Sequence, residues 1–180
     1  MPAWEIVAII AIVVAIALGV VLVVSRRRSD HLKSRFGPEY ERTLRESGDR
    51  RRAEHELERR EKRVERLHIH PLSPRHRDQF VAAWRNDQAR FVDDPSGAVT
   101  EADRLVQEVM KYRGYPVADF DRRVEDISVD HPHLVQNYRA ARDFAERNRR
   151  GEANTEEQRK ALVYYRALFE ELLEAQEVTR

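Results

Sequence analysis

The most pronounced hydrophobic feature of the chain is an unbroken run of 19 Ala, Val, Ile, Leu and Gly residues at positions 6–24. As an α-helix, such a run spans roughly 28 Å, which matches the ~30 Å hydrocarbon core of a bilayer. Fourteen of the 19 residues are Ile, Val or Leu. Each favours insertion by roughly 0.3–0.6 kcal/mol at mid-bilayer. The pattern therefore predicts a transmembrane anchor over residues 1–25.

A cleaved signal peptide is the alternative interpretation of this run. It would require a basic N-terminal region, a shorter apolar stretch and a small-residue cleavage site. Here the run follows Met-Pro-Ala-Trp-Glu and ends directly in Ser25 and the arginines Arg26, Arg27 and Arg28. Because arginine is unsuited to the position after a cleavage site, the sequence favours the anchor.

Basic residues flank the run on its C-terminal side alone. Arg26, Arg27 and Arg28 follow it, whereas no Lys or Arg precedes it. The positive-inside bias then predicts a single-pass protein of the plasma (inner) membrane, with its N-terminus outside and its C-terminal domain in the cytoplasm. Trp4 lies at the opposite boundary, where an indole ring favours the headgroup zone.

Small residues recur at four-residue spacing within the run. Ala11, Ala15 and Gly19 share one helical face. Small side chains at this spacing allow two membrane helices to approach closely, so this face is the candidate for a homodimer contact. The alternative is that Ala and Gly are simply common in such spans.

Residues 26–70 have the pattern of a charged juxtamembrane helix with few apolar positions. Residues 26–66 carry 15 basic and 10 acidic side chains. Gly37 and Pro38 predict a break, and the stripe that follows is narrow: Ala53, Leu57, Val64 and Leu67. We expect a solvated helical spacer, with a short coiled coil as the alternative. Within residues 49–67 glutamates interleave the arginines and no aromatic residue is available for stacking, so nucleic-acid binding is not indicated.

Residues 71–180 show helical periodicity in segment after segment. Apolar residues recur three and four positions apart, and Pro, Gly and Asp residues mark the ends of helices near 74–92, 95–113, 118–127, 132–150 and 155–176. The first helix directs Phe80, Trp84 and Val92 inward, and Thr155 with Gln158 predicts a capping box at the start of the last. The predicted fold is all-α: one N-terminal transmembrane helix, a charged juxtamembrane helix, and a small bundle of four to five helices.

A series of short motifs extends over most of the chain after residue 30. They are FGPEYERT (36–43), PLSP (71–74), QARFVDDP (88–95), EADRLV (101–106), RGYP (113–116), DHP (130–132) and YRALFEEL (165–172). Together they resemble a family of uncharacterised bacterial single-pass membrane proteins with a cytoplasmic helical domain. The resemblance implies the same layout of anchor and helical domain, and it implies no activity, cofactor or catalytic residue.

Composition argues against several classes of function. The 33 basic and 32 acidic residues nearly cancel, so no strong field attracts nucleic acid. Cysteine is absent, which excludes disulfides and thiol chemistry. Glycine occurs six times, and no phosphate loop, nucleophile elbow or His-Glu-x-x-His motif is present.

The candidate metal ligands are His68 and His70, which lie two residues apart and would project to one side of an extended segment. Further ligands would have to come from the remaining polar clusters, which are Asp93, Asp94, His131 and His133. Helix starts explain these clusters equally well, so we expect no catalytic, cofactor-binding or metal residues.

The sequence therefore favours a membrane-tethered helical adaptor without catalytic activity. Its predicted partners are the lipid bilayer, another membrane or cytoplasmic protein, and a second copy of the chain. The alternative is a membrane-anchored metal-dependent or hydrolytic enzyme that uses His68, His70 and nearby aspartates.

Overall fold

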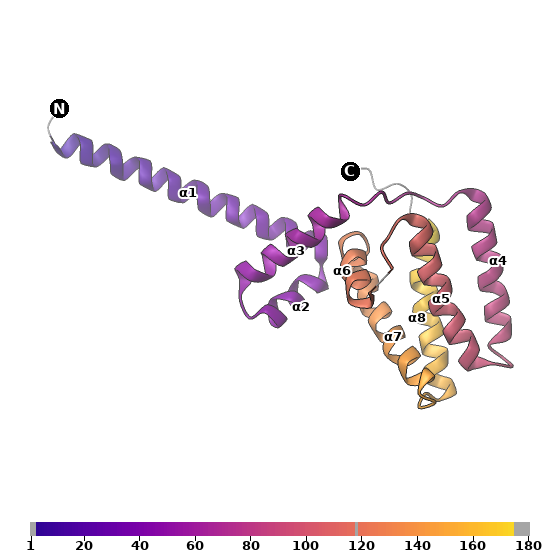
Figure 1. The fold of residues 1–180 in the computed structure, drawn as a ribbon. Coiled ribbons are helices and arrows are strands. Elements are labelled where there is room, and N and C mark those ends of the chain that lie inside the picture. The colour runs from indigo at the N-terminus through magenta and orange to yellow at the C-terminus, as the bar shows by residue number, and fades with distance from the viewer. Residues whose placement is uncertain (1–2, 118, 175–180) are drawn as a thin grey trace. The chain divides into compact units, whose positions relative to one another are not determined.

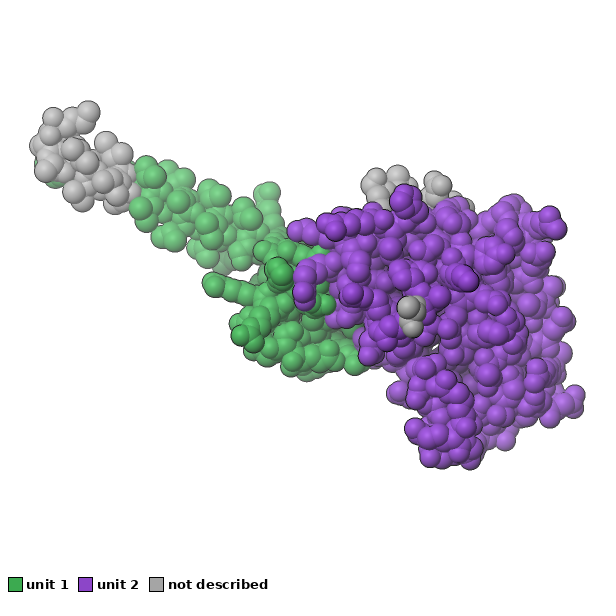
Figure 2. All heavy atoms as spheres, viewed as in Figure 1, with its two compact units in different colours: residues 1–58 green, residues 59–180 purple. Residues whose placement is uncertain are grey.

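The computed structural model describes residues 3–117 and 119–174, with the side chains of residues 3 and 5–11 outside the described set. Within these ranges the chain forms eight α-helices and one short 3-10 helix and has no strand (Figure 1). This confirms the predicted all-α fold. The chain divides into two compact units, residues 1–58 and 59–180 (Figure 2).

The first unit begins with the long helix α1 (Ala3–Phe36). The predicted break after it is confirmed, because Gly37 has a φ of 49° and Pro38 starts helix α2 (Pro38–Ser47). Helix α3 (Arg50–Val64) follows, and its residues 50–58 belong to this unit. Among the side chains that the structure describes, no helix combines the length and the apolar character needed to cross a membrane. The predicted span at residues 6–24 lies partly outside those side chains.

The charged segment after the apolar run has a core of its own. Its buried apolar residues come from all three helices and are Leu32, Phe36, Tyr40, Ala53 and Leu57. We expected a solvated helical spacer with a narrow apolar stripe, and in this part of the chain the stripe is instead buried against neighbouring helices. The reason is that the break at Gly37 allows three short amphipathic stretches to bury their stripes in one unit, whereas each stripe alone is too narrow to indicate a core.

A buried carboxylate links the three helices of this unit. Glu54 Oε1 on α3 accepts hydrogen bonds from Ser29 Oγ of α1 at 2.6 Å and from Tyr40 Oη of α2 at 2.9 Å. Arg50 donates to the same oxygen at 2.8 Å. Burial alone would raise the pKa of Glu54, but the hydrogen bonds from Ser29, Arg50 and Tyr40 lower it overall. Glu54 is therefore ionised at neutral pH, with one of its oxygens shared by three donors.

The second unit is the predicted bundle. Its helices lie within a few residues of the predicted boundaries and are α4 (Pro74–Arg90), α5 (Pro95–Arg113), α6 (Phe120–Asp130), the 3-10 helix η1 (Pro132–Leu134), α7 (Val135–Arg149) and α8 (Thr155–Glu174). Helices α5 and α7 both pack along α8, and α4 packs against α5 (Figure 1). The apolar stripe of α5 is buried as predicted, and so are Phe80 and Trp84 of α4. Val92 is 83% exposed, contrary to prediction, because α4 ends at Arg90.

Aromatic and polar contacts join the helices of the bundle. The Trp84 ring of α4 stacks on Phe169 of α8 with centroids 4.5 Å apart. Asp103 of α5 accepts a hydrogen bond from Tyr165 of α8 at 3.0 Å and pairs with Arg142 of α7 at 3.2 Å. One carboxylate thus connects the three central helices, which fixes their register more specifically than apolar packing alone.

The last helix is capped one residue earlier than predicted. α8 begins at Thr155, so Thr155 is already helical and Asn154 is the capping residue. Glu157 N donates to Asn154 Oδ1, and Asn154 N donates to a Glu157 carboxylate oxygen, both at 3.0 Å. This is a reciprocal capping box formed by Asn154 and Glu157 instead of Thr155 and Gln158.

The end of α3 belongs to the second unit and docks on α6. Arg63 Nε lies 2.7 Å from Asp126 Oδ1, and its Nη2 lies 2.8 Å from Glu125 Oε2. Asp126 is fully buried, and this burial raises its pKa in spite of the bond from Arg63. The C-terminal part of the predicted spacer is therefore tied to the bundle by a two-pronged arginine–carboxylate contact.

Gly114 allows the segment that follows α3 to pass close to the end of α5. It ends α5 in the left-handed conformation, with a φ of 96°. A Cβ added at Gly114 would lie 2.3 Å from the carbonyl oxygen of His68. Gly151 also has a positive φ, of 71°, but an added Cβ there meets no atom within 4 Å.

These two glycines allow a matched test of the close approach. Gly151→Ala should cost about 1 kcal/mol of unfolding free energy, from backbone strain alone. Gly114→Ala should cost about 2 kcal/mol more, because the methyl group also displaces the chain at His68. Denaturant unfolding of both variants, followed by circular dichroism, measures the difference. Equal losses would show that the approach to His68 carries no energetic weight.

Candidate functional site

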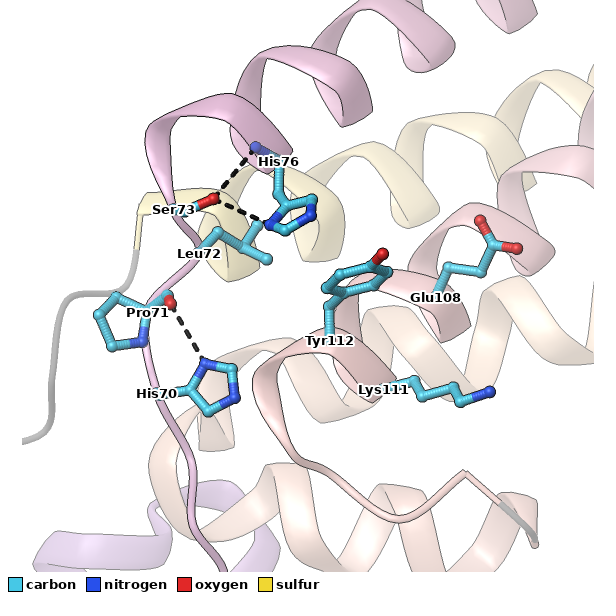
Figure 3. A pocket seen from close by; sticks show the side chains of 8 residues that line it. All are labelled: His70, Pro71, Leu72, Ser73, His76, Glu108, Lys111 and Tyr112. Carbon is cyan, nitrogen blue, oxygen red and sulfur yellow. Dashed lines mark hydrogen bonds between the residues drawn. The ribbon is translucent and has the colours of Figure 1, made fainter.

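A cleft opens beside the start of α4 and the end of α5 (Figure 3). It encloses about 820 Å³. The segment before α4 and the first turn of α4 form one wall and the last turns of α5 the other; the lining residues are His70, Pro71, Leu72, Ser73, His76, Glu108, Lys111 and Tyr112. A concave surface that mixes apolar groups with a few polar ones is the usual form of a binding site.

Arg113 holds the first wall of the cleft in place. Its guanidinium is buried and donates from Nη1 to the Leu172 carbonyl of α8 at 3.1 Å and from Nε to the His70 carbonyl at 3.4 Å. In the other direction His70 N donates to the Arg113 carbonyl at 3.0 Å. Arg113 therefore links the segment before α4 to the end of α5 and to α8.

Aromatic rings form the floor of the cleft. The Tyr112 ring lies between His76, with centroids 4.6 Å apart, and Phe80, which it meets edge-on at 5.5 Å. Tyr112 is nevertheless 48% exposed. Pro71 and Leu72 lie across from it in Figure 3. A tyrosine held by packing but open to solvent is typical of a contact surface for a partner, because it offers area with little loss of side-chain entropy.

Charged groups lie at the rim. Glu108 is ion-paired with Arg104 of the same helix. Lys111 forms no ion pair with any residue that the structure describes. The cleft thus presents one uncompensated cation beside an aromatic floor, which suits a ligand that combines an apolar group with an acidic one.

The side chains of Ser73 and His76 are hydrogen-bonded to each other in the lining of the cleft. Ser73 Oγ lies 2.8 Å from His76 Nδ1, and it also accepts from His76 N at 3.3 Å as the N-cap of α4 (Figure 3). No described carboxylate hydrogen-bonds the remaining nitrogen of the His76 ring. The serine hydroxyl is therefore used to start a helix, and the third group that orients the base of a nucleophilic pair is not found among the described residues.

The structure separates the residues that the sequence offered as metal ligands. His70 lines the cleft and His68 is exposed next to it, whereas Asp94 caps α5 by accepting from Gly97 N at 2.8 Å. His131 and His133 both approach Glu171, at 3.0 Å and 3.9 Å. No group of three or more His, Cys, Asp or Glu side chains within the described part of the chain is arranged to hold a metal ion.

His131, which is buried, pairs with the partly exposed Glu171 outside the set of residues that line the cleft. Burial lowers the pKa of the His131 imidazole, although the Glu171 carboxylate opposes this, so the ring is neutral at pH 7. Its Nδ1 lies 3.0 Å from Glu171 Oε1, whereas its buried Nε2 has no hydrogen-bond partner among the described residues. The pair links the end of α6 to α8, and no described nucleophile bonds to the open nitrogen.

Asp87 of α4 is a second buried titratable group. Both carboxylate oxygens are buried and lack a hydrogen-bond partner within residues 3–117 and 119–174. Burial, and after it the negative charge of Glu101, raises the pKa of Asp87 to about 6. Arg90 and Arg104 lower it by a smaller amount, and Asp94 adds to the rise. Asp87 therefore keeps its proton to a higher pH than an exposed aspartate does.

The residues predicted to flank the membrane lie on the first unit. Trp4 is 69% exposed, and Arg26 and Arg27 are exposed as well. Arg28 is ion-paired with Glu58. In the proposed dimer face, Ala15 and Gly19 are exposed, whereas the side chain of Ala11 lies outside the described residues. The dimer contact stays a prediction.

The sequence pattern did not identify the cleft. Tyr112 and Arg113 lie at the end of the helix predicted near 95–113, and no motif in the sequence marks either of them as part of a site. The prolines at 71 and 74 around Ser73 predicted the helix start near residue 74 that forms one wall of the cleft.

Comparisons with known proteins place no further constraint on the site, since no family model, curated protein or solved structure matches the chain.

The raised pKa of Asp87 predicts an unusual dependence of stability on pH. Between pH 3.8 and about 6 the unfolded chain loses this proton while the folded chain keeps it, so stability falls as pH rises through this window. The variant Asp87→Asn should recover about 1 to 3 kcal/mol of the lost unfolding free energy at pH 7. At pH 4 its unfolding free energy should be close to that of the wild type. The measurement is urea unfolding of the full chain in mild detergent across this range.

Asp78, an exposed aspartate on the same helix, provides the control for this experiment. The variant Asp78→Asn should follow the wild-type curve. If the unfolding free energy of Asp87→Asn also had the same pH dependence as that of the wild type, the buried carboxyl would not be the source of the pH dependence.

Proposed function

We propose that the protein is a membrane-tethered helical interaction module, anchored by α1 and contacting a partner protein through the cleft beside Tyr112. The observation that carries the proposal is the exposure of apolar side chains on every side of one helix. Ten large residues between positions 12 and 24 are each more than half exposed: Ile12, Val13, Val14, Ile16, Leu18, Val20, Val21, Leu22, Val23 and Val24.

This exposed surface has no stable place in water. Each Å² of apolar surface left in contact with water costs about 25 cal/mol. A patch that surrounds a helix cannot be buried against one neighbouring face, because a soluble partner would cover a single stripe. A bilayer covers all sides at once, which supports α1 as the anchor.

The charge pattern supports the orientation of the anchor. Arg26 and Arg27 are exposed directly after the apolar residues, and neither forms an ion pair with a described residue. Basic groups at this position are attracted to anionic lipid by about 1 kcal/mol each. Residues 25–180 are then on the cytoplasmic side.

The cleft supports the second half of the proposal. It combines a packed but solvent-facing Tyr112 with the uncompensated charge of Lys111, and Arg113 holds its walls at a fixed separation. Such a preformed surface binds a short segment of a partner with little reorganisation. Tethering raises the local concentration of the cleft around other membrane proteins, so that even a weak contact is occupied.

The anchor is tested by fractionation and by a topology reporter. The full-length protein should stay in the membrane pellet after alkaline carbonate extraction and require detergent for release. A phosphatase that is active only in the periplasm should be silent when fused after Arg180. Recovery in the soluble fraction would refute the anchor, and an active phosphatase would reverse its orientation.

The cleft is tested by photo-crosslinking in cells. A photoreactive phenylalanine analogue at position 112 should give a discrete adduct with one partner, and the variant Lys111→Glu should reduce its yield about fivefold. The same analogue at Val163, which is 51% exposed on α8, is the control. Adducts of equal yield and identity at both positions would show that the cleft is not the contact surface.

A further inference from the structure

A second hollow lies in the first unit, where the apolar part of α1 gives way to its basic part. It encloses about 520 Å³. Its lining combines three valines with polar and charged groups, and the residues are Val20, Val21, Val24, Ser25, Arg28, Arg51, Glu54 and His55. We refer to this hollow as the juxtamembrane notch.

Two helices supply the walls of the notch. Val20, Val24 and Arg28 are four residues apart and share one face of α1. Arg51 and His55 share one face of α3 in the same way. The hydrogen bond from Ser29 to Glu54 and the ion pair of Arg28 with Glu58 hold α3 against α1 at this level. The notch is therefore a built feature of the unit.

The charges of the notch leave a net cation. The charge of Glu54 is balanced by Arg50, and that of Arg28 by Glu58. Arg51 lines the notch and forms no ion pair or side-chain hydrogen bond with a described residue.

The position of Arg51 at the start of α3 makes its positive charge electrostatically unfavourable, because the N-terminal end of the helix dipole is also positive. The first three residues of the helix are all arginines, Arg50 to Arg52, and no acidic residue lies in its first turn. Asp49 caps this helix by accepting a hydrogen bond from Arg52 N at 2.8 Å, but its single charge does not balance both Arg51 and Arg52, so a further anion bound here would be favoured.

The notch lies at the depth of the lipid headgroups if α1 crosses the bilayer. Val24 is the last apolar residue of the run, and Arg28 follows it by one turn, a rise of about 6 Å. The headgroup layer on each side of the hydrocarbon core is about 5–8 Å thick. The valines then face the upper part of an acyl chain, and Arg51 and His55 face the phosphate.

We propose that the juxtamembrane notch binds one anionic phospholipid, with its phosphate at Arg51 and His55 and the first part of an acyl chain against Val20, Val21 and Val24. This inference rests on the membrane anchoring proposed above. It places a specific lipid site within the general attraction between arginines and the membrane. It predicts that arginines of equal charge, inside and outside the notch, contribute differently to lipid binding.

The experiment compares Arg51→Gln with Arg52→Gln. Both residues are exposed arginines in the first turn of α3, and only Arg51 lines the notch. Full-length protein in mild detergent is mixed with equal amounts of phosphatidylglycerol and phosphatidylcholine of the same chains, and bound lipid is measured by native mass spectrometry. Wild type and Arg52→Gln should favour phosphatidylglycerol about fivefold, and Arg51→Gln should lose most of this preference.

A steric pair tests the same site without changing charge. Val21→Trp fills the notch, whereas Leu22→Trp places the same ring on α1 outside it. Only Val21→Trp should reduce the retained lipid. Circular dichroism of each variant confirms that the helices are intact. Equal lipid binding within both pairs would overturn the proposal, as general electrostatic attraction would then explain the result.

Two further arms separate the alternatives. Inorganic phosphate and glycerol phosphate in large excess should leave phosphatidylglycerol bound; complete displacement by either would assign the notch to a free phosphate and overturn the lipid assignment. Carbonate extraction of the same variants reports on the anchor. Variants that stay in the membrane while lipid preference is unaffected contradict the notch alone, whereas wild-type protein in the soluble fraction contradicts the anchor on which it rests.

Discussion

The exposure of large apolar side chains on all sides of α1 is the constraint on which the proposed function depends. The large apolar side chains between residues 12 and 24 are each more than half exposed, whereas Ser29, five residues after Val24, is buried. The helix does not break at this point, because α1 continues to Phe36. A single helix thus changes from a surface that suits lipid to one that packs on one face. The folded juxtamembrane unit begins at this change.

The Glu54 carboxylate joins the helices of the first unit just after the exposed apolar part of α1. It accepts hydrogen bonds from α1, from α2 and from its own helix, so the three helices are joined by one buried ion. A buried charge is tolerated only when such partners are present, and loss of one of them leaves it strongly destabilised. Because Arg50 in the same network balances the charge of Glu54, the nearby Arg51 remains the uncompensated cation of the notch. The fold of the first unit and its proposed lipid site therefore have a common origin.

The fold was largely predictable from sequence and the candidate sites were not. Helix boundaries follow from Pro, Gly and Asp residues, which act locally, so α4, α5 and the break at Gly37 are where the pattern placed them. The capping box was misplaced by one residue because Asn154 and Thr155 are both good caps. The spacer was misjudged because Ser29, Tyr40 and Glu54 come from three separate segments. Only the folded chain brings them together.

The proposed function depends on whether lipid surrounds α1, and a depth profile measures this environment directly. Spin labels placed one at a time along residues 12–28 of the full chain in phosphatidylglycerol-containing bilayers report their accessibility to oxygen and to a water-soluble nickel complex. Oxygen accessibility should be highest near residue 15 and fall towards Arg26, where nickel accessibility rises. Uniform nickel accessibility along the whole series would place the helix in water and contradict the account.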